Sequence, residues 1–159
     1  MPTQQILSPT QVAHKLQRIS YQIAENTTQN TAITLIGMNA NGLHIATILQ
    51  QQLTVLGKNI TLANATITDN KLVIDTNVSL HNATVILVDD VLNTGYTMAL
   101  AFAAIMDKGA KNIHLAVLVN RDHRNYCIMP NYTGVSLATT LQEHISVQIN
   151  GDEITATLS

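Results

Sequence analysis

The chain has 159 residues, of which 46% are hydrophobic and 11% charged, and its formal net charge at pH 7 is −2. This length corresponds to one domain, which we place over residues 1–159, and it buries enough surface to fold without a disulfide or a structural metal. The composition excludes a disordered tail, a collagen and a coiled coil, and the lack of excess cations argues against a broad electrostatic grip on nucleic acid.

A helix is expected near the N-terminus. Ser8 suits the N-cap, Pro9 suits the first helical position, and Gln11 completes a capping box. The apolar residues that follow at helical spacing, up to an end near residues 25–27, are Val12, Leu16, Ile19 and Ile23.

The rest of the chain alternates short apolar runs with helical segments. In chain order we expect a strand at 32–37, a loop at 38–41, a helix at 42–56, a strand at 60–67, a turn at 69–71, a strand at 72–74, a strand at 85–88, a loop at 89–96, a helix at 97–108 and a strand at 113–119.

The C-terminal part of the chain follows a different pattern. Residues 120–138 show no regular periodicity, and expected strands at 143–149 and 153–158 flank Asn150-Gly151, a dipeptide typical of a hairpin turn. Strands that alternate with helices predict an α/β fold with a mostly parallel central sheet flanked by helices. We expect the irregular region and the hairpin to form a small hood lobe on the same core.

The ends of the chain and its cysteine content bear on the cellular compartment. Cys127 is the only cysteine, so no internal disulfide can form, and no cysteine–histidine cluster has zinc-ligand spacing. The N-terminus lacks the features of a signal peptide, and no stretch approaches the roughly 20 apolar residues that span a bilayer. We therefore expect a cytoplasmic protein with no membrane partner.

The segment from Val85 to Thr97, VILVDDVLNTGYT, carries the strongest chemical signal. A buried strand ends in Asp89 and Asp90, and a short loop then opens a helix at the edge of the sheet where ligands bind. Free N–H groups at a helix start suit a phosphate, while paired carboxylates accept hydrogen bonds from sugar hydroxyls. We therefore predict a sugar-phosphate site; the alternative is two surface acids beside a well-capped helix. The predicted phosphate-loop residues are Asn93, Thr94, Gly95, Tyr96 and Thr97.

This segment resembles the phosphoribosyl-diphosphate-binding motif of the type I phosphoribosyltransferases. Residues 117–149 are similar to the C-terminal half of the bifunctional pyrimidine operon regulator and uracil phosphoribosyltransferase family. The matching stretches in this chain are Asn120-Arg121-Asp122-His123-Arg124, Tyr132-Thr133-Gly134 and Thr139-Thr140-Leu141-Gln142-Glu143.

The resemblance implies a type I phosphoribosyltransferase fold and a set of roles. The loop at 93–97 would hold the 5-phosphate, and Asp89 and Asp90 would hold the ribose hydroxyls at the reacting centre. A Mg²⁺ ion would bridge diphosphate and ribose oxygens without a dedicated protein cage. The reaction would displace diphosphate from phosphoribosyl diphosphate with the nitrogen of a pyrimidine base, for which the resemblance favours uracil. Arg121 and Asp122 would lie over the base, unless that loop is merely solvated.

Three departures from the family concern its diphosphate half. The family's Lys-Thr-Arg-Gly loop reads Asn39, Ala40, Asn41 and Gly42 here, so the glycine remains and the cations are absent. The family's long flexible hairpin is short between residues 67 and 82, with Lys71 as its cation, and Leu141 replaces an arginine. These changes predict retained ribose-5-phosphate affinity with weakened or altered catalysis.

Three functions follow for comparison. The first is a uracil phosphoribosyltransferase, and the alternative is a catalytically weakened regulatory protein that binds nucleotides or sugar phosphates. The third, the RNA-binding role of the resembled family, is not expected, because eight lysine and arginine residues give no basic face.

The apolar helix at 97–110 leaves surface for self-association, so we expect a homo-oligomer. Tyr126 and Tyr132 are expected either to wall the base pocket or to pack the small lobe.

Overall fold

The computed structural model describes residues 2–75 and 77–159. Its elements in chain order are β1 (Gln4–Leu7), α1 (Pro9–Asn26), β2 (Ala32–Met38), α2 (Asn39–Val55), β3 (Asn59–Thr68), β4 (Lys71–Ile74), β5 (Thr84–Leu92), α3 (Tyr96–Asp107), β6 (Asn112–Arg121), β7 (Tyr132–Leu137), β8 (Ile145–Asn150) and β9 (Glu153–Leu158). Within the described residues, no helix is both long enough and apolar enough to cross a membrane.

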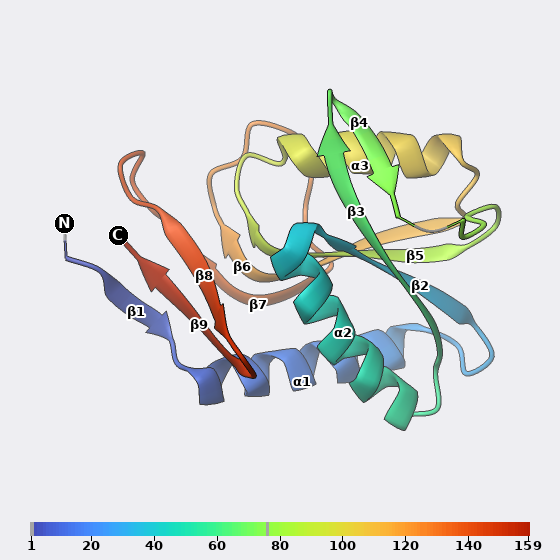
Figure 1. Ribbon diagram of the computed structural model, residues 1–159, viewed down its shortest axis with the longest axis horizontal. Helices are drawn as coiled ribbons and strands as arrows, with labels where there is room; N and C mark the ends of the chain where they lie inside the picture. The colour runs from blue at the N-terminus through green and yellow to red at the C-terminus, as the bar shows by residue number, and fades with distance from the viewer. Residues whose placement is uncertain (1, 76) are drawn as a thin grey trace.

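Two sheets organise the chain (Figure 1). The larger has six strands in the order β4-β3-β2-β5-β6-β7, and every neighbouring pair is parallel except β3 and β4. The smaller is an antiparallel sheet in the order β1-β9-β8, which brings the two ends of the chain side by side. The predicted α/β fold with a mostly parallel central sheet is confirmed.

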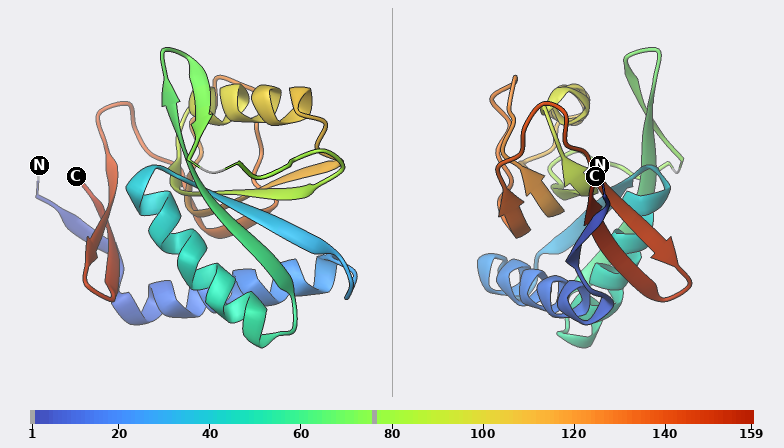
Figure 2. Two further views of the ribbon diagram at one scale, coloured as in Figure 1. Left: turned by 45° about the vertical axis from the view of Figure 1, so that its right-hand side comes forward. Right: turned by 90° about the vertical axis from the view of Figure 1, so that its left-hand side faces the viewer.

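Helices cover both faces of the large sheet, with α1 and α2 on one side and α3 on the other (Figures 1 and 2). Successive side chains of a strand point to opposite faces, so β5 divides its apolar residues between two cores. Ile86 and Val88 pack on the side of α1 and α2, whereas Val85 and Leu87 pack on the side of α3. This two-sided burial explains why β2, β5 and β6 are continuous apolar runs.

The expected N-terminal helix is present with its predicted cap. The Ser8 hydroxyl accepts a hydrogen bond from the Gln11 backbone N–H, and the Gln11 side chain accepts one from the Ser8 N–H. The four apolar residues that were expected on one face, Val12, Leu16, Ile19 and Ile23, are all buried.

The expectation of irregular chain at 120–138 is wrong at both ends. Strand β6 continues to Arg121, and β7 adds a sixth strand parallel to it. Long-range contacts hold β7: Arg18 of α1 donates hydrogen bonds of 2.7 and 2.8 Å to the carbonyls of Thr133 and Gly134. A six-residue strand with an internal glycine gives little local signal, because its partners lie far away in sequence.

Other element boundaries also differ from expectation. The expected loop at 38–41 does not exist, since α2 begins at Asn39 directly after β2, with Asn39 at a φ of 58°. The expected loop at 89–96 is shorter, because β5 extends to Leu92. The sequence reading also missed β1, which pairs with β9 at the opposite end of the chain.

Candidate functional site

The residues that the sequence predicts to form a sugar-phosphate site lie at the carboxyl end of β5. There the structure forms a cavity of about 190 Å³, lined by Asn39 and by residues 89–98. Because β2 and β5 are parallel neighbours, the start of α2 and the loop before α3 meet at this edge of the sheet. The structure thus brings together the carboxylate pair, the predicted phosphate loop and part of the 39–42 segment.

The phosphate loop is a tight turn that ends in the N-terminus of α3. Gly95 caps the helix with a φ of 89°, a left-handed conformation that glycine adopts without strain. The Thr94 hydroxyl accepts a hydrogen bond of 3.3 Å from the Tyr96 N–H. The first N–H groups of a helix have no partner within it, so this loop presents donors and a positive dipole end to an anion.

The carboxylate pair is held by the local backbone. Asp89 accepts a hydrogen bond of 2.8 Å from the Asp90 N–H, and Asp90 accepts one of 2.8 Å from the Val91 N–H. Burial raises the pKa of the Asp89 carboxyl well above its ordinary value, and the adjacent Asp90 raises it further. Hydrogen bonds donated by sugar hydroxyls, or a nearby cation, would stabilise the ionised form of this carboxyl.

The segment 39–42 reaches the site through Asn39 and Asn41. The Asn41 amide donates to Asp90 at 2.9 Å and to the Val147 carbonyl of β8 at 3.1 Å, so it joins the carboxylate pair to the small sheet. The Asn39 carbonyl accepts a hydrogen bond of 2.9 Å from the Asn64 amide. Gly42 packs its backbone against β5, while Ala40 is exposed and does not line the cavity.

Arg121 and Asp122 occupy different environments. Arg121 is buried, and its guanidinium donates to the Thr139 hydroxyl at 2.5 Å and to the Thr140 carbonyl at 2.8 Å, which fixes the segment after β7. Asp122 is exposed and lines a second cavity, of about 510 Å³, together with Asn120 and residues 124–130. The structure therefore places Asp122, and not the Arg121 side chain, on a cavity wall.

Sequence reasoning missed how residues 124–126 cover the phosphate loop. The N–H groups of Asn125 and Tyr126 donate to the Thr94 carbonyl at 2.9 and 3.1 Å, and the Arg124 guanidinium contacts the Asn93 carbonyl. The only sequence signal for these contacts was that residues 124–126 closely follow Arg121 and Asp122, which were predicted to lie at the site. The two tyrosines also separate: Tyr132 is buried in the core, whereas Tyr126 lines the second cavity.

The oxygen donors at this site fit a magnesium ion that is shared with a substrate. Among residues 2–75 and 77–159, no group of three or more histidine, cysteine, aspartate or glutamate side chains could hold a metal by itself. Mg²⁺ retains several waters and often uses only one or two carboxylates beside substrate phosphates. Asp89 and Asp90 supply two such carboxylates on the cavity wall.

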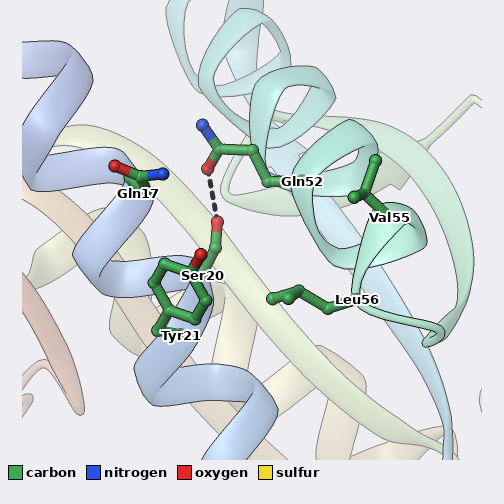
Figure 3. A pocket seen from close by; sticks show the side chains of 6 residues that line it. All are labelled: Gln17, Ser20, Tyr21, Gln52, Val55 and Leu56. Atoms are coloured by element: carbon green, nitrogen blue, oxygen red, sulfur yellow. Dashed lines mark hydrogen bonds between the residues drawn. The ribbon is translucent and has the colours of Figure 1, made fainter.

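A further cavity, of about 150 Å³, lies between α1 and α2 and does not share residues with the carboxylate site (Figure 3). Its lining includes Tyr21, Val55 and Leu56, and the Ser20 hydroxyl donates to the Gln52 side chain at 2.5 Å across it. Its lining contains neither a carboxylate nor a cation, so it is not a candidate for the sugar-phosphate site.

Comparisons with known proteins identify the family of this chain. The family model described as "Phosphoribosyl transferase domain" matches residues 2–149. The chain is 35% identical to the bifunctional protein PyrR of Enterococcus faecalis, with 94% of this chain and 91% of that protein aligned. It is 34% identical to the bifunctional protein PyrR of Haemophilus ducreyi, with 90% and 88% aligned.

Solved structures show the same fold at low sequence identity. A hypoxanthine-guanine phosphoribosyltransferase from Bacillus anthracis superposes with a TM-score of 0.81 at 17% identity, covering 98% of both chains. The hypoxanthine phosphoribosyltransferase of Trypanosoma cruzi superposes with a TM-score of 0.78 at 11% identity, covering 96% of this chain and 95% of that one. The chain therefore belongs to the phosphoribosyl transferase family, and within it to the group of the bifunctional PyrR proteins.

Proposed function

We propose that this phosphoribosyltransferase transfers ribose 5-phosphate from phosphoribosyl diphosphate to uracil, releasing diphosphate and a nucleoside monophosphate. The observation that carries the proposal is the carboxylate pair and the phosphate loop on one cavity, with a second, larger cavity beside the same loop. The first cavity suits a ribose phosphate, and the second leaves room for a base.

The proposed roles follow from the chemistry of each group. The N–H groups of residues 95–97 and the hydroxyls of Thr94 and Thr97 bind the 5-phosphate. Asp89 and Asp90 accept hydrogen bonds from the ribose hydroxyls and stabilise positive charge that develops on the ribose in the transition state. A bound Mg²⁺ would neutralise charge on the leaving diphosphate. The protein itself mainly holds the reactants in place and excludes water.

The choice of uracil rests on the resemblance and on the PyrR relatives. The two purine phosphoribosyltransferases named above share 17% and 11% identity with this chain, so they support the fold and not a purine substrate. The larger cavity combines the amide side chain of Asn125 with the exposed ring of Tyr126, while the amide of Asn120 is engaged by Arg124 and Ser136. Amide groups and a ring surface suit the carbonyl and N–H edges and the flat face of a pyrimidine.

The decisive experiment is a transfer assay with phosphoribosyl diphosphate and Mg²⁺, offered uracil, hypoxanthine or guanine separately. We expect uridine monophosphate to form from uracil and little product from either purine. The matched control is the double variant Asp89→Asn, Asp90→Asn, which keeps the side-chain shapes and removes the charge. Product formed from a purine and not from uracil would refute the proposed substrate.

A second candidate is a catalytically weakened protein that binds nucleotides. It is favoured by the lack of a cation at residues 39–42 and by the Asn41 amide, which is already engaged by Asp90 and Val147. Under this second hypothesis, the wild type binds a nucleoside monophosphate more tightly than phosphoribosyl diphosphate. Asn41→Arg then tightens the binding of phosphoribosyl diphosphate. Calorimetry with Mg²⁺ distinguishes the candidates, because tight wild-type binding of phosphoribosyl diphosphate favours the enzyme.

Partners beyond the substrates remain predictions. Membrane association is not expected. The small number of cations argues against RNA binding, whereas the similarity to the bifunctional PyrR proteins argues for it. Titration with single-stranded RNA at low salt would decide, since binding to phosphates weakens as salt rises. We also expect a homo-oligomer in the cytoplasm. Sedimentation velocity at several protein concentrations would determine the oligomeric state.

A further inference from the structure

The hairpin of β3 and β4 ends in a turn that leaves little freedom at its tip. Asp69 and Asn70 form this two-residue turn with φ values of 51° and 60°, and Thr68 pairs directly with Lys71 across it. Two central residues with positive φ are typical of a type I′ turn, whose twist matches that of the strands. Regular strand pairing therefore sets the backbone position of Asn70 at the tip.

Tyr96 connects this tip to the phosphate loop. Its hydroxyl donates a hydrogen bond of 2.8 Å to the Asn70 side-chain oxygen. Tyr96 is also the first residue of α3, directly after Gly95, and its backbone N–H belongs to the predicted phosphate loop. One residue thus contributes its backbone to the loop and its side chain to the hairpin.

The ring of Tyr96 also contacts the segment at residues 124–126 that covers the loop. It lies 5.6 Å from the ring of Tyr126, centroid to centroid, at an interplanar angle of 52°, a favourable tilted arrangement. The Tyr126 N–H donates to the Thr94 carbonyl at 3.1 Å. The wall of the larger cavity is therefore linked to the phosphate loop by a backbone bond and by the Tyr96 ring.

We propose that Tyr96 is a positioning residue that holds the β3–β4 hairpin and the 124–128 segment against the phosphate loop. We call its contacts with Asn70 and Tyr126 the clasp. The second part of the proposal rests on the proposed function. An anion bound at residues 95–97 orders the Tyr96 backbone and so strengthens the contacts of its side chain with the two segments. In this chain the tip of the short hairpin is then held beside the phosphate loop by one side chain, and its order is coupled to phosphate binding.

Hydrogen exchange of the free protein tests the clasp without any ligand. Tyr96→Phe removes the hydroxyl and keeps the ring, whereas Asn70→Gly removes the acceptor and retains a residue that favours positive φ. Each variant should speed amide exchange at residues 67–72 by about two- to tenfold, as expected for the loss of one hydrogen bond. The matched control is Tyr21→Phe, at an exposed tyrosine of α1. Because Asn70→Gly also changes the turn backbone, the double variant Tyr96→Phe, Asn70→Gly should exchange at the same rate as Asn70→Gly alone.

Ribose 5-phosphate tests the coupling. In the wild type it should slow exchange both at residues 94–98 and at the hairpin tip, whereas in Tyr96→Phe it should slow exchange at residues 94–98 only.

Unchanged exchange in both single variants, or additive effects in the double variant, would overturn the clasp. Protection of the hairpin tip in Tyr96→Phe equal to that in the wild type would overturn the coupling. If ribose 5-phosphate does not protect residues 94–98 in the wild type, the proposed site and the coupling both fail, and the clasp is then decided by the ligand-free comparison.

Discussion

Asp89 combines a proposed role in binding with a cost in stability. Its carboxyl lies at the end of a buried strand, next to a second carboxyl and with the Asp90 N–H as its hydrogen-bond donor. Burial disfavours the charged form and raises the pKa of the Asp89 carboxyl in the folded protein. A residue retained at such a cost is typical of a functional site.

We predict that Asp89→Asn stabilises the free protein at neutral pH while it weakens ribose binding. Since the folded pKa of Asp89 is raised, the folded state binds more protons than the unfolded chain between the two pKa values. The unfolding free energy therefore falls as the pH rises through this window, which begins near the ordinary aspartate value of about 4. Melting temperatures between pH 4 and pH 8 should depend less on pH in Asp89→Asn. The control is Asp152→Asn at the exposed β8–β9 turn; a lower melting temperature for Asp89→Asn at pH 7 would contradict the prediction.

Asn41 supplies a second prediction at the level of one side chain. Asn41→Ala removes the donor to both Asp90 and Val147, so we expect a loss of about 1 kcal/mol in unfolding free energy and weaker binding of ribose 5-phosphate. Inorganic phosphate, which does not need the carboxylates, should bind as it does to the wild type. Urea unfolding and calorimetry measure the two effects, with Asn59→Ala at the exposed start of β3 as the control. Equal losses for both ligands would show that Asn41 shapes the whole site.

At the scale of elements, the site depends on how closely α2 approaches β5. A Cβ atom on Gly42 would lie 2.7 Å from the Val88 carbonyl oxygen, well inside normal contact distance. The helix can therefore lie against the end of β5 only if residue 42 has no side chain. This contact places Asn39 and Asn41 beside the carboxylate pair.

We predict that Gly42→Ala moves the start of α2 away from β5 and costs about 1–3 kcal/mol of stability. The same change should weaken ribose 5-phosphate binding, because Asn41 moves together with the helix. Thermal unfolding and calorimetry would measure both effects. The control is Gly151→Ala, where a Cβ meets no atom within 4 Å and any cost comes from its φ of 62°. Unaltered ligand binding in Gly42→Ala would mean that the position of α2 is not critical.

At the scale of the whole molecule, the two sheets share one apolar core. Val147, Ile154 and Ala156 of the small sheet belong to the same buried cluster as residues of α1, α2 and the large sheet. The antiparallel pairing of β1 with β9 also ties the N-terminal segment to the C-terminal hairpin. The small sheet is therefore expected to fold together with the rest of the chain, and the single domain over residues 1–159 stays a prediction.

We predict a single unfolding transition for the whole chain. Urea unfolding followed by circular dichroism and by tyrosine fluorescence should give coincident curves. Ile154→Ala should destabilise both signals together by about 2–5 kcal/mol, because Ile154 is buried in the shared core. Two separate transitions, or loss of the small sheet alone in Ile154→Ala, would show that the hairpin is an independent unit.

Local patterns in the sequence determined much of this protein. The capping box at Ser8 and Gln11 and the apolar run at 85–88 are signals between neighbours in sequence, so helix α1 and the central strand could be read directly. The carboxylate pair and the loop at 93–97 could also be identified, because a strand end and a helix start lie next to each other in the chain.

Only the tertiary structure decided the features that join distant segments. Strand β7 depends on contacts with Arg18 and β6, and β1 depends on pairing with β9. The contacts of Tyr96 with Asn70 and Tyr126 join three segments that are far apart in the sequence. The burial of Arg121 was equally hidden, since its partners Thr139 and Thr140 lie 18 and 19 residues further along the chain. Side-chain direction and strand pairing depend on packing between elements, and propensity or spacing within one element does not specify them.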